Sequence, residues 1–204
     1  MGCLIDWGSA GRPIGNFGEG LESGDRHVVA LFPDGALIAV IDGLGHGVEA
    51  AAAARTAASL LEASPQDPVT DLLQRCHEAL RRTRGAVMSV ASFHSRQSSI
   101  TWAGVGNVDV VLLRSPASNG RPREDLLKRG GIVGYQLPAL RPASVPVCQG
   151  DTLIMTTDGI RSGFVDHLDV TRPPQENAES ILARYGMRTD DALVVVAQYR
   201  GNSS

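Results

Sequence analysis

Short apolar runs that follow one another in pairs are the feature that most constrains this fold. The runs at residues 26–32 and 36–41 flank Pro33-Asp34-Gly35, a combination typical of a tight hairpin turn. Further strand-like runs lie at residues 86–94, 98–104, 108–114, 152–157 and 192–199. The pairing of neighbouring runs favours mainly antiparallel sheets over a doubly wound parallel sheet.

Three helices are expected between these strands. Residues 47–62 are rich in alanine, the best helix former, and predict the first helix. A second helix is expected after Pro68, with Asp67 as its cap, because Val69, Leu72, Leu73, Cys76 and Leu80 form one apolar stripe. A third is expected over residues 174–185. The polar residues 115–131 are expected to form a loop. No βαβ repeat occurs, so the predicted fold class is α+β.

Composition excludes several classes of protein. The 204 residues are 43% hydrophobic, which suits a single domain over residues 1–204 and argues against disorder. A net charge of −3 argues against a general nucleic-acid binder. No apolar stretch approaches the roughly 20 residues that span a membrane, and no secretory signal is present. Three scattered cysteines suggest a reduced, cytoplasmic location.

Acidic residues stand at the tips of apolar strands, where a core residue would be expected. Asp42 ends the run at 36–41, Asp158 ends the run at 152–157, and Asp190 precedes the last strand. Each alone is explained as a turn, cap or loop residue. Together they suggest that strand tips bring carboxylates close to one another. An unpaired buried carboxylate is too costly to be incidental.

Such a cluster repels itself unless a cation binds, and ligation by oxygen alone suits Mg²⁺ or Mn²⁺. Gly43 follows Asp42 and would let the backbone turn sharply and a carbonyl approach the metal. Asp25, which directly precedes the strand at 26–32, is a candidate fourth carboxylate. It is preferred to Glu22 because it repeats the placement at a strand tip.

Several short motifs of the sequence resemble those of a known family. The segments SGDRHVV, IDGLGHGVEAA, AGVGN, GGIVG, TTDGI and TDDALVVV occur in the order seen in metal-dependent Ser/Thr phosphatases of the PPM superfamily. The similarity is closest to the bacterial SpoIIE-like branch and its small stressosome phosphatases. It covers roughly residues 20–199. The combination of IDGLGHG with TTDGI and TDDA is the specific part.

The resemblance implies a four-layer αββα sandwich with two Mn²⁺ or Mg²⁺ ions at one edge. Asp42 and Gly43 match the element that bridges both metals, Asp158 and Asp190 match ligands of one metal, and Asp25 matches the acidic position near the other. Asp42, Asp158 and Asp190 are therefore the expected catalytic residues. A hydroxide bridging the metals would attack phosphorus, without a protein nucleophile.

The implied activity is hydrolysis of phosphoserine or phosphothreonine in proteins, with phosphorylated STAS-domain proteins of the stressosome as substrates. Two alternatives remain open: a metal-dependent hydrolase of small phosphoesters, and a non-catalytic binding module on the same fold.

Roles near the predicted site are also expected for His46, Asn107, Gly130 and Gly131. His46 either donates a proton to the leaving group or holds its loop through a hydrogen bond, and the second role is preferred. Asn107 is expected to be structural, in a tight turn. Gly130 and Gly131 are expected to shape the cleft.

Overall fold

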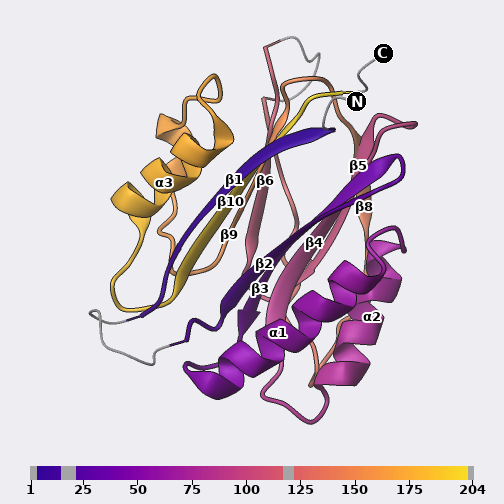
Figure 1. The fold of residues 1–204 in the computed structure, drawn as a ribbon, viewed down its shortest axis with the longest axis vertical. Coiled ribbons are helices and arrows are strands. Elements are labelled where there is room, and N and C mark those ends of the chain that lie inside the picture. Colours follow the sequence, from indigo (N-terminus) through magenta and orange to yellow (C-terminus); the bar gives the residue numbers. More distant parts are fainter. Residues whose placement is uncertain (1–3, 15–21, 117–121, 202–204) are drawn as a thin grey trace.

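The computed structural model describes residues 4–14, 22–116 and 122–201. Two five-stranded sheets lie face to face, with helices on both outer faces (Figure 1). Every pair of strands in the described residues is antiparallel. The predicted αββα sandwich is therefore confirmed.

The first sheet has the order β1-β10-β9-β6-β7 and the second has the order β2-β3-β4-β5-β8. The strands of the first sheet are β1 (Ile5–Arg12), β10 (Ala192–Tyr199), β9 (Thr152–Thr156), β6 (Asp109–Leu113) and β7 (Arg123–Asp125). Those of the second are β2 (Asp25–Phe32), β3 (Gly35–Gly43), β4 (Ala86–His94), β5 (Ser99–Val105) and β8 (Ala143–Pro146).

The helices cover opposite faces of the sandwich. The helices α1 (Val48–Ala63) and α2 (Val69–Leu80) pack on the second sheet, and α3 (Pro174–Tyr185) packs on the first (Figure 1). A 3₁₀ turn, η1 (Phe164–His167), precedes α3. None of the helices in the described residues is long and apolar enough to cross a membrane.

The strand β3 shows why its apolar run is continuous. Alternate side chains of a strand point to opposite faces. Ile38 and Val40 therefore enter the core between the sheets, whereas Leu37 and Ile41 pack under α1 and α2. Both faces are buried, so no polar alternation is left. The carboxylate of Asp42 comes where this doubly buried strand reaches the end of the sandwich.

Several local predictions were wrong. The strand β7 lies within residues 115–131, which were expected to be loop throughout, and β1 and β8 were not predicted. These strands lie at the edges of the sheets, where the apolar pattern is weakest. Asp67 does not cap α2: Pro68 occupies the N-cap position, and the Asp67 carboxylate pairs with Arg75 at 2.6 Å.

Candidate metal centre

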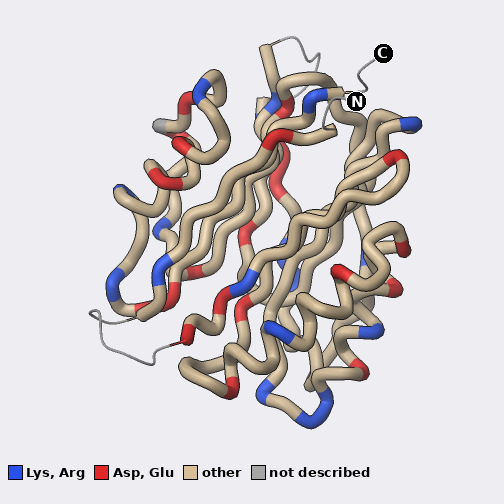
Figure 2. The backbone as a smooth tube through the Cα atoms, in the orientation of Figure 1, with Lys and Arg blue, Asp and Glu red and all other residues tan. Residues whose placement is uncertain are grey.

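The four predicted carboxylates come to one end of the sandwich from both sheets. Asp25 opens β2 and lies opposite Asp42 of β3 in the strand register. Asp158 follows β9 and Asp190 precedes β10, and these two strands are antiparallel neighbours. Figure 2 shows acidic positions gathered where these strands begin or end. The two pairs are distant along the chain and meet only because the sheets stack.

Thr157 connects the two sheets at this end. Its hydroxyl donates a hydrogen bond to Oδ2 of Asp25 at 2.7 Å, and it accepts one from the backbone N–H of Leu193 at 2.9 Å. Asp25 belongs to one sheet, whereas Thr157 follows a strand of the other. Thr157 lies inside the TTDGI motif, but no role was predicted for it.

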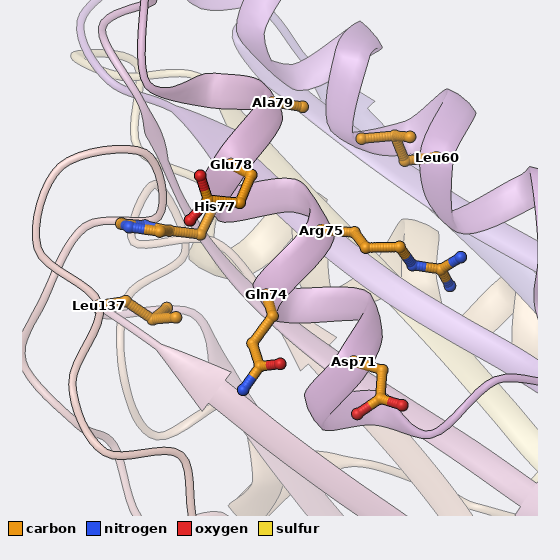
Figure 3. Close-up of a pocket in the computed structure, with 8 residues that line it drawn as sticks. All are labelled: Leu60, Asp71, Gln74, Arg75, His77, Glu78, Ala79 and Leu137. Atoms are coloured by element: carbon orange, nitrogen blue, oxygen red, sulfur yellow. The ribbon is translucent and has the colours of Figure 1, made fainter.

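Asp42, Asp158 and Asp190 line a pocket of about 660 Å³, together with His46 and Asn107. A second hollow of about 850 Å³ lies along α2, between Leu60 of α1 and Leu137 (Figure 3). Its lining holds charged side chains spread along α2 but no converging carboxylates. The chemistry therefore favours the smaller pocket as the functional site.

His77 lies on the wall of the larger hollow. It is buried, and its Nδ1 accepts a hydrogen bond from the backbone N–H of Gly134 at 3.0 Å. This bond attaches α2 to the turn at residues 132–136 and accounts for the histidine without a ligand.

Burial and mutual repulsion raise the pKa values of three of these carboxylates. Burial, followed by the charges of Asp42 and neighbouring acids, raises the pKa of Asp25 to about 8, although the bond from Thr157 opposes the shift. Burial, followed by the charge of Asp158, raises the pKa of Asp42 to about 7. The pKa of Asp190 is also raised, by burial and then by Asp158. A cation would relieve the burial and the repulsion together.

Asn107 was expected to be structural, in a tight turn, and the structure also places it at the pocket. Its side-chain N–H₂ donates to Oδ2 of Asp158 at 2.6 Å, and the residue lines the pocket. The preceding Gly106 has φ +99°, a conformation that favours glycine and sets the turn into β6. The amide can therefore orient one carboxylate of the cluster.

The second aspartate of the TDD motif has a structural role. Asp191 is buried, and its two oxygens accept backbone hydrogen bonds from Gly24 at 2.7 Å and from Ile14 at 2.6 Å. It anchors the chain just before Asp25. Both oxygens are thus occupied, which leaves Asp190 as the residue of this pair that faces the pocket.

The glycines after Asp42 and Asp158 are needed for close packing. A Cβ on Gly43 would lie 2.1 Å from the carbonyl oxygen of Ala50, and one on Gly159 would lie 1.8 Å from that of Asp191. Neither glycine has a positive φ, so the sharp turn expected at Gly43 is not the reason for it. Gly130 lines the pocket, in agreement with its expected role in the cleft.

His46 is exposed at the pocket wall. Its side chain makes no hydrogen bond within the described part of the chain, so the hydrogen bond that was expected to hold its loop is not observed. The proton-donor role stays a prediction.

The donor set fits a divalent cation by its chemistry. The pocket presents carboxylate and amide oxygens, the ligands that Mg²⁺ and Mn²⁺ prefer. As the side chains stand, no three His, Cys, Asp or Glu residues among those described are close enough together to hold one ion.

Residues 33–200 match the family described as Stage II sporulation protein E (SpoIIE). Among characterised proteins, the chain is 25% identical over 163 residues to the phosphoserine phosphatase RsbX of Bacillus subtilis (strain 168), covering 79% of this chain and 80% of RsbX.

Solved structures agree with this relationship. A chain from a study of the bacterial stressosome, as a modular system adapted to control secondary messenger signalling, is 31% identical with a TM-score of 0.84, over 95% of this chain and 98% of that one. The crystal structure of RsbX in complex with magnesium has a TM-score of 0.82 at 23% identity, over 96% and 95% of the two chains. The match to the family over most of the chain shows that this protein belongs to the SpoIIE family of PPM-type phosphatases.

Proposed function

We propose that this enzyme is a metal-dependent protein phosphatase that hydrolyses phosphoserine or phosphothreonine in STAS-domain proteins of a stressosome. The main support is that Asp42, Asp158 and Asp190 reach one pocket from two sheets. Asp25 lies opposite Asp42 in the register of β2 and β3. The similarity to a phosphoserine phosphatase supports the reaction, and the similarity to a stressosome chain supports the substrate class.

Each residue of the site has an assigned part. Asp42, Asp158 and Asp190 would hold the divalent ions with the carbonyl of Gly43, and Asp25 would bind beside them. Asn107 would orient Asp158, and Thr157 would position Asp25. Bound Mn²⁺ or Mg²⁺ would activate water and neutralise the charge of the phosphoryl group. His46 stands where it could donate a proton to the departing alkoxide.

The test is phosphate release from a phosphorylated STAS-domain protein with Mn²⁺ or Mg²⁺. Asp42→Asn and Asp158→Asn should abolish release, and EDTA should stop it. Asp6→Asn is the matched control, because it makes the same change at an exposed carboxylate on β1, paired with Arg200. Release at the wild-type rate in excess chelator, or from Asp42→Asn, would refute the proposal.

A hydrolase of small phosphoesters remains the second candidate, because the pocket alone does not select a protein substrate. Comparing kcat/KM on phosphoserine proteins and on free phosphometabolites separates the two. Calorimetry with Mn²⁺ addresses the remaining alternative, since a binding module without catalysis need not take up the ion.

We also propose that residues 1–204 form one catalytic domain with a cytoplasmic location.

A further inference from the structure

Two segments beside the pocket contain arginines. One is the turn between α2 and β4, which contains Arg84, and the other is the segment between β7 and β8, which contains Arg129. Resting on the proposed function, we infer that these two residues form a basic rim. This rim binds acidic side chains next to the phosphorylated residue of the protein substrate.

Arg84 lies directly beside the loop that follows Asp42. The position that a Cβ on Gly45 would take is 2.7 Å from Nη1 of Arg84, and Gly45 lines the pocket. The backbone fixes this neighbourhood, because the N–H of Leu44 donates to the carbonyl of Gly85 at 3.0 Å. Figure 2 shows basic positions grouped in the turn after α2, beside the start of α1.

Arg129 approaches the same pocket from another segment. Its carbonyl accepts a hydrogen bond from the N–H of Gly106 at 2.8 Å, and both Gly106 and Gly130 line the pocket. The two segments are also joined to each other, because Ala86 and Val133 exchange backbone hydrogen bonds at 3.0 and 2.9 Å. Backbone hydrogen bonds therefore connect the two segments of the rim to each other and to the residues of the pocket.

The charges of the rim are available to a partner. In the part of the chain that the structure describes, Arg129 takes part in no ion pair. Arg84 pairs with Glu49 at 2.5 Å, but both side chains are more than half exposed, at 52% and 68%. An exposed pair of this kind is worth little, so a carboxylate from a substrate can replace Glu49.

The placement distinguishes recognition of the protein from recognition of phosphate. Neither arginine lines the pocket, whose carboxylates are those of Asp42, Asp158 and Asp190. A phosphoryl group bound to metal ions at these carboxylates would lie inside this rim, whereas the side chains that flank it in a protein would reach the arginines. Charge complementarity of this kind mainly adds specificity and faster association.

The experiment compares kcat/KM on two phosphoserine peptides that differ only in having Glu and Asp, or Gln and Asn, around the phosphoserine. Wild type should prefer the acidic peptide, and Arg84→Ala should lower that preference about two- to fivefold, the range of one partly exposed ion pair. Glu49→Gln should raise the preference, because it removes the competing carboxylate. The preference should fall with added salt.

Arg96→Ala is the matched control, since Arg96 is an exposed arginine paired with Asp34 in the distant β2–β3 hairpin. It should keep the wild-type preference. Equal rates of wild type on both peptides, or an unchanged preference in Arg84→Ala, would overturn the inference while leaving the proposed function intact. Failure of wild type to hydrolyse the peptides and a phosphorylated STAS-domain protein alike would instead overturn the proposed function.

Discussion

The hydroxyl of Thr157 donates a hydrogen bond to the carboxylate of Asp25 from one sheet to the other, at 2.7 Å. The same oxygen accepts the N–H of Leu193 at the start of β10. One side chain thus links the two sheets at this end of the sandwich and positions the half-buried carboxylate of Asp25.

Replacing Thr157 by Val should therefore lower the free energy of unfolding by about 1–3 kcal/mol, because the N–H of Leu193 would be left buried without a partner. Thr157→Ser keeps the hydroxyl and should lose less. Urea denaturation of the three proteins measures the difference. Equal stability of the Val and Ser variants would show that the hydroxyl contributes nothing.

Gly159→Ala should destabilise the protein by several kcal/mol, since its Cβ would lie 1.8 Å from the carbonyl oxygen of Asp191. Gly43→Ala should do the same against Ala50. Gly130→Ala is the control, because a Cβ there meets nothing within 4 Å. In thermal denaturation, the melting temperatures of Gly159→Ala and Gly43→Ala should lie well below that of the control. A melting temperature of Gly159→Ala equal to that of Gly130→Ala would contradict the packing argument.

The metal-free protein should lose stability as the pH rises. The pKa of Asp25 is about 8 in the folded state, against an ordinary value of 3.8. Between these values the folded state keeps a proton that the unfolded state releases. The free energy of unfolding contributed by this group therefore falls as the pH rises from about 4 to about 8. Asp42, with a pKa of about 7, acts in the same direction.

Urea denaturation in EDTA at pH 5.5 and pH 8, conditions chosen at about the middle and top of this window, measures the loss. Asp25→Asn should reduce the pH dependence, because its amide does not titrate. Mn²⁺ at pH 8 should restore stability, since an ion that binds only the folded state stabilises it. Stability that rises with pH in EDTA would be inconsistent with the shifted carboxylates.

Asn107→Ala should weaken Mn²⁺ binding by about 10- to 100-fold, the usual cost of losing a group that orients a ligand. The reason is the 2.6 Å hydrogen bond from Asn107 to Asp158. Calorimetry with Mn²⁺ gives the affinity independently of catalysis. Asn177→Ala, at a buried amide that bonds backbone carbonyls near α3, controls for loss of an amide elsewhere. Unchanged affinity in Asn107→Ala would assign the amide a purely structural role.

Local patterns in the sequence predicted the α+β class, the antiparallel sheets and the four acidic candidates, whereas the four layers were implied by the family resemblance. An apolar run buried on both faces, as in β3, is visible in the sequence, and so is a carboxylate that ends it. The edge strands β1, β7 and β8 escaped because one face or edge of each is left to solvent, which weakens the apolar pattern.

The sequence alone could not separate carboxylates by their partners. Asp151 also stands at a strand tip and is fully buried, but the guanidinium of Arg114 pairs with it at 2.8 Å, so it needs no metal. Asp191 is likewise occupied by two backbone N–H groups. Neither partner is near its acid in the chain.

By itself, the amino-acid order determined which segments become buried strands and helices, because burial periodicity is a local property. The tertiary structure alone decided which of the acids share a pocket, that Thr157 and Asn107 hold two of them, and that arginines stand at its rim. These relations depend on how two sheets stack, and stacking brings together residues that no local pattern connects.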